Sequence, residues 1–67
     1  MSKAKRYYTT LHCEVIRTTE KAVLVQLENG DEHWLPRSEC DNGDAIDVGD
    51  DAIDVADWLL HNRGIEV

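Results

Sequence analysis

The sequence predicts an α+β domain, a small curled antiparallel sheet of four to five strands, partly barrel-like, with one short C-terminal helix. Two β-rich runs flank an Asn-Gly pair in the first half, and a Trp-Leu-Leu cluster precedes a glycine near the end. A chain of 67 residues has room for one hydrophobic core. We therefore expect a flexible basic N-terminus over residues 1–6 and a single compact acidic domain over residues 7–67.

The first half of the chain has the composition of β-strands. Residues 7–17 alternate loosely between apolar and polar side chains and are rich in β-branched residues. In residues 22–27, Val23, Val25 and Leu27 share one face, which is the period of a half-buried strand.

The predicted turn after this strand is Asn29-Gly30. An Asn-Gly pair between two β-like runs predicts a hairpin with a type I′ turn, whose two central residues both have positive φ. The return strand covers residues 32–35 and ends at Pro36, which has no N–H for the sheet.

Residues 44–50 and 51–57 are two similar runs, each reading Asp-Ala-Ile-Asp-Val-x-Asp. They predict a strand, a tight turn and a second strand over residues 44–55. The inward positions of this hairpin are Ile46, Val48, Ile53 and Val55, and the outward ones are Asp47 and Asp54. Apolar residues also recur seven apart, so a helix over residues 44–50 stays open. Gly49 and the β-branched residues favour the strand.

The C-terminal helix is expected over residues 56–63, with Asp54 or Asp57 stabilising its start and Gly64 following its end. Because the chain contains no Phe, Trp34 and Trp58 are expected to be anchors of the core.

Two cysteines do not make a disulfide framework. We expect Cys13 and Cys40 to be reduced thiols that pack as small hydrophobic side chains. Whether the two approach each other stays open at this point.

The negative charge is concentrated in one part of the chain. The net charge is −7, and residues 39–57 contain eight acids and no Lys, Arg or His. The other 48 residues hold six acids and seven bases, so they are nearly neutral. A surface of this kind is repelled by nucleic acid and anionic membranes and attracted to basic partners.

Enzymatic and metal chemistry are not indicated. His12 and Cys13 are neighbours on a strand, so they point to opposite faces and form no catalytic dyad. The cysteines and histidines lack the paired spacing of zinc sites, and residues 41–44 do not supply the ligand order of an EF-hand loop. We expect a non-enzymatic protein with no cofactor and no metal.

No apolar run reaches the roughly 20 residues of a membrane span, and the start of the chain has no apolar signal-peptide core. A cytoplasmic protein is therefore expected. Binding of single-stranded nucleic acid through residues 1–8 is a further reading, because Tyr7 and Tyr8 follow three basic residues. The overall negative charge counts against it.

A series of short motifs resembles a group of small proteins of phages and mobile elements. Those proteins read Lys-Ala-x-Leu-Val, Trp-x-Pro-Lys-Ser and Trp-Leu in the same order. The matching residues here are 20–25, 34–38, 49–50, 58–60 and 63–65. The resemblance covers residues 14–65. This chain departs from the pattern at Arg37, where Lys is usual, and in its Asp-rich segment before the helix.

Small acidic proteins of this kind are similar to anti-CRISPR proteins, particularly inhibitors of type I CRISPR-Cas systems. Several of those inhibitors imitate DNA and occupy a cationic site of the Cascade surveillance complex. The resemblance implies a phage-encoded inhibitor that acts in the host bacterial cytoplasm. Its expected partner is a basic protein surface, with no direct nucleic acid and no membrane, and a monomer is favoured over an oligomer.

The candidate binding residues follow from charge and not from the resemblance. The main surface is expected to consist of Asp44, Asp47, Asp50, Asp51, Asp54 and Asp57, with Glu39 and Asp41 at its rim and Glu28, Asp31 and Glu32 extending it. The alternative function is a small non-enzymatic adaptor that binds a protein partner through its sheet edge or its Trp34–Pro36 face. An exposed Trp34 would favour this alternative.

Overall fold

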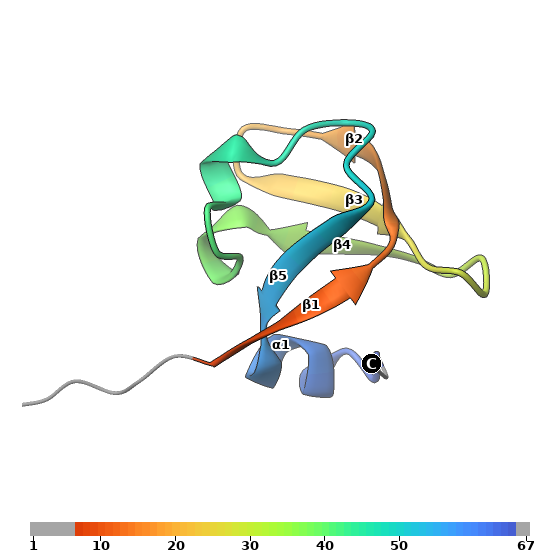
Figure 1. Cartoon of the computed structure of the whole chain (residues 1–67), viewed down its shortest axis with the longest axis vertical. Coiled ribbons are helices and arrows are strands. Elements are labelled where there is room, and N and C mark those ends of the chain that lie inside the picture. Colours follow the sequence, from red (N-terminus) through yellow and green to blue (C-terminus); the bar gives the residue numbers. More distant parts are fainter. Residues whose placement is uncertain (1–6, 66–67) are drawn as a thin grey trace, which may run out of the picture.

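The structure, a computed structural model, describes residues 7–65 and contains five strands, two short 3-10 helices and one α-helix there (Figure 1). In chain order the elements are β1 (Tyr8–His12), β2 (Glu14–Thr18), β3 (Ala22–Gln26), β4 (Glu32–Pro36), η1 (Arg37–Glu39), η2 (Gly43–Ala45), β5 (Ala52–Ala56) and α1 (Asp57–Asn62). The segment expected to be a flexible basic N-terminus, residues 1–6, lies outside the described residues.

The strands form two antiparallel sheets, β1 with β5, and β2, β3 and β4 in that order. The prediction of a small antiparallel sheet with one short C-terminal helix is confirmed. The strands of residues 7–65 do not close into a barrel. The side chain of Arg63, which follows α1, contacts β4, because Arg63 Nη1 donates to the Trp34 carbonyl oxygen (2.6 Å).

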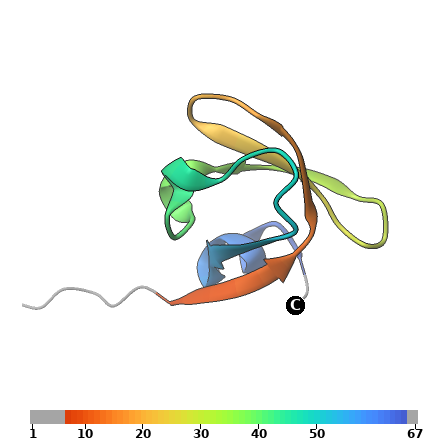
Figure 2. The ribbon, with the colours of Figure 1, turned by 45° about the horizontal axis from the view of Figure 1, so that its top comes forward.

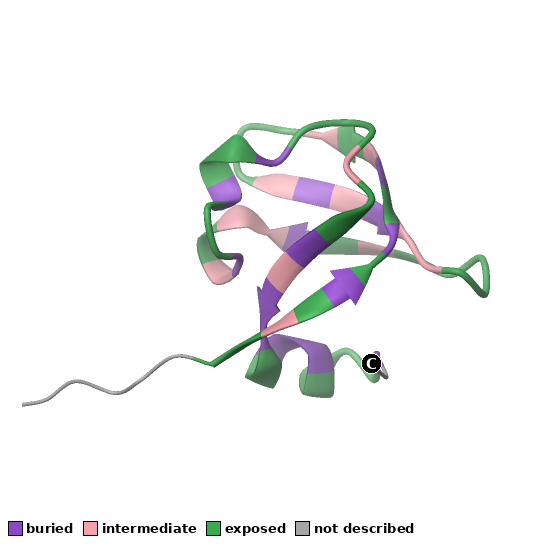
Figure 3. Cartoon of the chain, in the orientation of Figure 1, coloured by how far each residue is buried: buried purple, intermediate pink, exposed green. Residues whose placement is uncertain are grey.

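The hydrophobic core lies between the two sheets, which face each other (Figures 1 and 2). Strands β2 to β4 contribute Val15, Val23, Val25 and Leu35, and strands β1 and β5 contribute Leu11, Ile53 and Val55. The side chains of Leu59 and Leu60 on α1 join the same core. Buried and more accessible residues alternate along the strands, as Figure 3 shows, because successive side chains point to opposite faces.

The β3–β4 hairpin is confirmed, but its turn differs from the expected type I′. Only Gly30 has a positive φ, 93°, whereas Asn29 does not. The Gly30 N–H donates to the Leu27 oxygen (2.9 Å) and the Leu27 N–H donates to the Asp31 oxygen (2.7 Å). This is the pattern of a turn followed by a glycine bulge, which gives the hairpin a longer loop.

The predicted strand at residues 44–50 is wrong, and so is the alternative of a continuous helix. The segment starts as η2 and continues as a loop, and β5 pairs with β1 instead. The side chains of Ile46, Ile53 and Val55 point inward as expected, whereas that of Val48 is 57% exposed.

The side chain of Arg37 explains this loop. Its Nη1 donates to the carbonyl oxygens of Gly43 (2.7 Å) and Ile46 (3.0 Å), and its Nε donates to the Thr19 oxygen (3.0 Å). The Ile46 carbonyl, which a hairpin over residues 44–55 would need, is therefore occupied. The guanidinium of Arg37 is a planar donor group that reaches three carbonyls together.

The helix is confirmed, since α1 spans most of the expected residues and ends before Gly64. The expectation that both tryptophans are core anchors is wrong, because Trp34 is 43% and Trp58 is 53% exposed. Alternation along β4 turns Leu35 inward and therefore Trp34 outward. The narrow space between the sheets is filled by Val, Leu and Ile.

Candidate functional site

The acidic segment, defined as residues 39–57, runs from η1 through η2 and the following loop into β5 and the first turn of α1. Its carboxylates all lie at the surface, since no polar or charged residue among residues 7–65 is buried. They fall into two groups according to whether the protein holds the side chain in place.

Four of the aspartates accept hydrogen bonds that fix their positions. Thr10 Oγ1 donates to Asp54 Oδ1 (2.6 Å), and the Thr9 hydroxyl donates to Asp57 Oδ1. Both threonines belong to β1, so these bonds tie β1 to β5 and α1. In the loop before β5, the Asp47 N–H donates to Asp50 Oδ2 (3.0 Å), and the Val48 N–H donates to Asp47 Oδ1 (2.8 Å).

Three other aspartates, Asp41, Asp44 and Asp51, are exposed and accept no hydrogen bond from residues 7–65 through their carboxylates. Their backbones are nevertheless held. The Asp41 N–H donates to the Asp54 oxygen (2.9 Å), and the Cys13 N–H donates to the Asp51 oxygen (3.1 Å). These carboxylates are charges displayed from a fixed backbone.

Glu39 is also held by a hydrogen bond. Trp58 Nε1 donates to Glu39 Oε1 (3.1 Å), so this rim carboxylate connects η1 to α1.

Residues 50–54 line two different surface hollows. Asp50 and Asp54 line one, together with Asp41 and Thr10. Asp51 lines the other.

Glu28 lines the second hollow together with Asp51, and so does Glu14. Sequence reasoning missed Glu14. It lies opposite Gln26 at the start of β2, a register that only the folded sheet reveals.

The other two predicted extensions, Asp31 and Glu32, line neither of these two hollows. Asp31 is in the β3–β4 loop, where its Oδ2 accepts from Asn29 Nδ2 (3.2 Å) and its N–H donates to Asn29 Oδ1 (2.9 Å). Glu32 is on β4, paired with Gln26 and therefore two strands away from Glu14.

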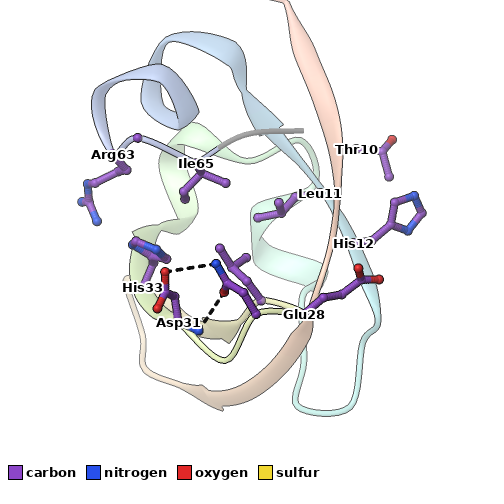
Figure 4. Close-up of a pocket in the computed structure, with 11 residues that line it drawn as sticks. Thr10, Leu11, His12, Glu28, Asp31, His33, Arg63 and Ile65 are labelled. Carbon is purple, nitrogen blue, oxygen red and sulfur yellow. Dashed lines mark hydrogen bonds between the residues drawn. The ribbon is translucent and has the colours of Figure 1, made fainter.

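A further hollow of about 660 Å³ lies between β1, the β3–β4 loop and the residues after α1 (Figure 4). Leu11 and Ile65 point into it, while Thr10 and His12 point to the other side of β1. His33, Asp31 and Arg63 lie around its edge. Leu11 and Ile65 therefore form the apolar floor of the hollow, and polar groups stand at its rim. The imidazole of His12 is not directed at those polar groups.

Both cysteines are free thiols buried in the core. Burial raises the pKa of Cys13 to about 11, and the negative charge of Asp51 adds to the shift. Burial likewise raises the pKa of Cys40 to about 11, with the charge of Glu39 adding and that of Arg37 opposing. The neutral thiols are thus favoured in the folded protein.

We expect the free energy of unfolding to fall as pH rises above 9. The unfolded chain ionises its thiols near the ordinary pKa of 9.0, whereas the folded chain keeps both protons until about pH 11. Deprotonation therefore favours the unfolded state through this window. Urea unfolding between pH 8 and pH 10.5 measures the effect, and Cys13→Ala/Cys40→Ala should show a shallower decline. An equal decline in both chains would contradict the assignment.

Within residues 7–65, no three His, Cys, Asp or Glu side chains come together in a way that could hold a metal ion. In the same part of the chain, no helix is long and apolar enough to cross a membrane. Comparisons of the sequence with protein-family models and curated proteins, and of the fold with solved structures, give no match.

Proposed function

We propose that this chain is a non-enzymatic, phage-encoded inhibitor that binds a cationic nucleic-acid site of a host defence complex by presenting carboxylates in place of phosphates. The complex we propose is the Cascade complex of type I CRISPR-Cas systems, in the bacterial cytoplasm. The partner surface is basic protein, and the chain acts as a monomer without binding nucleic acid or membrane.

One observation carries the proposal. The acidic segment displays eight carboxylates at the surface, and it contains no cation to neutralise them. Gathering like charges in this way raises the self-repulsion of the folded chain, so simple solubility is a weaker explanation than recognition of a basic surface.

The hydrogen bonds give the display a defined shape. Asp54 and Asp57 are held by threonines of β1, and Asp47 and Asp50 are held within the loop. Preorganised charges bind with less loss of side-chain entropy than mobile ones. The regular spacing that a hairpin over residues 44–55 would have given is replaced by an irregular surface of loop, strand and helix start.

The experiment is competition between this chain and double-stranded target DNA for purified type I Cascade. The chain is expected to displace the DNA, because phosphates and carboxylates would occupy the same cationic site.

The alternative of an adaptor is favoured by the outer face of the β2–β3–β4 sheet. Leu24 lies there between Arg17 on β2 and Trp34 on β4, in one row across three strands. Trp34 is 43% exposed, and its indole N–H donates to no group of residues 7–65. Exposed Trp and Arg beside an apolar residue are typical of protein interfaces. In this reading the partner binds the outer face and not the acidic segment.

A further inference from the structure

Strand β1 is the border of the two-stranded sheet, with β5 on one side and no strand of residues 7–65 on the other (Figure 2). The Asp57 N–H donates to the Tyr7 oxygen (3.0 Å), and the Cys13 N–H donates to the Asp51 oxygen (3.1 Å). In an antiparallel ladder every second residue bonds to the neighbouring strand, so the odd-numbered residues of β1 bond to β5. The residues whose N–H and C=O groups point to the outer edge are therefore Tyr8, Thr10 and His12.

No hydrogen bond within residues 7–65 uses these outward groups of β1. The other sheet edges are at least partly covered. Residues 40–41 pair with the outer side of β5, and residues 49–50 bond to Val15 of β2. At the outer edge of β4, Arg63 donates to a carbonyl oxygen, and Pro36 has no N–H to offer. Strand β1 therefore presents the longest run of unpaired backbone groups.

The sequence of β1, Tyr-Thr-Thr-Leu-His, does nothing to block this edge. It contains no Lys, no acid and no proline, and its pairing with β5 has no bulge. These are the devices by which exposed strand edges usually avoid pairing. The side chains of the three outward residues are themselves exposed. Such an edge can accept an extended peptide as an added strand, whose affinity comes from main-chain hydrogen bonds.

The two faces of β1 determine which side chains an added strand would carry. On one face, Leu11 lies on the apolar floor of the hollow with Ile65. On the other face, Thr10 Oγ1 donates to Asp54 Oδ1 (2.6 Å), so a carboxylate lies one strand away. Two strand spacings, about 10 Å, separate the backbone of Asp54 from that of an added strand, and a Lys or Arg side chain can largely bridge this gap. A segment that alternates apolar and basic residues fits both faces.

A second copy of this chain fits the edge less well. Each copy carries a net charge of −7, and pairing two β1 strands would bring Asp54 of both copies to the same face. Like charges that gather in this way oppose association. A basic segment of another protein has the complementary charge.

We propose that β1 accepts an extended segment of a partner protein as an added antiparallel strand, with its apolar side chains toward the hollow and its basic ones on the face of Asp54. Antiparallel addition continues the pairing of β1 with β5 and is the more stable arrangement per residue. The inference goes beyond the proposed function, because the contact is made by main-chain groups of β1, and Asp54 alone is common to both surfaces.

The probe is a fluorescently labelled peptide of seven residues that alternates Lys and Val and begins and ends with Lys. It is titrated by anisotropy with the whole chain at fixed ionic strength. In the antiparallel pair the lysine N–H groups point to β1 and the valine N–H groups point away from it. N-methylation of two lysine nitrogens should therefore weaken binding about ten-fold, whereas N-methylation of two valine nitrogens should change it by no more than about three-fold.

The two methylated peptides have the same composition and charge, so attraction by charge alone predicts equal affinities. Equal affinities, the reverse order, or no binding of the unmethylated peptide would overturn the added strand.

His12→Pro tests the same contact from the side of the protein. Proline removes an outward N–H of β1 and leaves the ladder to β5 intact, a position that an edge strand tolerates. It should weaken binding of the unmethylated peptide roughly three- to ten-fold. The control His12→Thr keeps the N–H and should bind as the wild type does. Equal binding by folded His12→Pro would contradict the proposal.

Amide hydrogen exchange of the wild-type chain gives an answer that needs no variant. Without peptide, the amide protons of Thr10 and His12 should exchange quickly and that of Leu11 slowly, and the peptide should slow the first two. Slow exchange of Thr10 and His12 in the free chain would mean that the edge is covered, which overturns the proposal. If these results hold but the chain fails to displace DNA from Cascade, the proposed function is wrong and the added strand still stands.

Discussion

A chain in which Asp41, Asp44 and Asp51 are all replaced by Asn is expected to fold normally and to bind Cascade roughly 10- to 100-fold more weakly than the wild type. These three carboxylates are exposed and accept no hydrogen bond from the described residues. Their removal therefore takes away binding charge without breaking a structural contact. Calorimetric titration at fixed ionic strength measures the loss, and circular dichroism checks the fold.

The matched control keeps the charge at the same three positions, as Asp41→Glu/Asp44→Glu/Asp51→Glu. It should bind within a few-fold of the wild type. If instead the Asn variant binds normally while Trp34→Ala abolishes binding, the outer face of the β2–β3–β4 sheet is the interface and the adaptor alternative is correct.

Aspartates that accept structural hydrogen bonds are poor positions for testing the role of charge in binding. On sequence alone, charge reversal at Asp47 and Asp54 is the natural choice, since both were expected to point outward from a hairpin. Asp54 accepts a hydrogen bond from Thr10, and Asp47 accepts one from the Val48 N–H. Loss of binding in that double variant would not distinguish the effect of the lost charge from the effect of the lost hydrogen bonds.

Gly43→Ala is expected to destabilise the fold by about 2–4 kcal/mol. A Cβ built on Gly43 would lie 2.0 Å from the backbone oxygen of Arg37. The backbone on one side or the other must move, which disturbs the hydrogen bonds from Arg37 to Gly43 and Ile46. For a domain of this size the loss is a large part of the total stability.

Gly30→Ala is the control for this variant. Gly30 has a positive φ but nothing within 4 Å of a built Cβ, so only backbone strain of about 1 kcal/mol is expected. Urea unfolding of both variants measures the difference. Equal stability of Gly43→Ala and Gly30→Ala would mean that the close approach to Arg37 is not maintained in solution.

Local patterns predicted the parts of the fold that local interactions determine. The position of the hairpin at Asn29-Gly30, though not its turn type, the inward residues of β5 and the helix ahead of Gly64 all follow from neighbours in sequence. The strand expected at residues 44–50 did not form because its competitors are distant in sequence: Arg37 donates to the Ile46 carbonyl within it, and β5 pairs with β1. A sequence pattern carries no signal for either contact.

The candidate surface was predictable as charge but not as geometry. The composition located the acidic segment, and Glu28 does line the same hollow as Asp51. The bond between Trp58 and Glu39 and the position of Glu14 depend on how η1, α1 and β2 pack. Trp34 and Trp58 were expected inside because they are large and apolar, yet smaller aliphatic residues fill the core.

The most direct test of the central claim is the displacement of labelled double-stranded target DNA from purified type I Cascade. The wild-type chain should release the DNA in proportion to its binding, and the triple Asn variant should do so only at roughly 10- to 100-fold higher concentration. DNA that stays fully bound to Cascade at saturating wild-type chain would contradict the claim that the carboxylates take the place of phosphates.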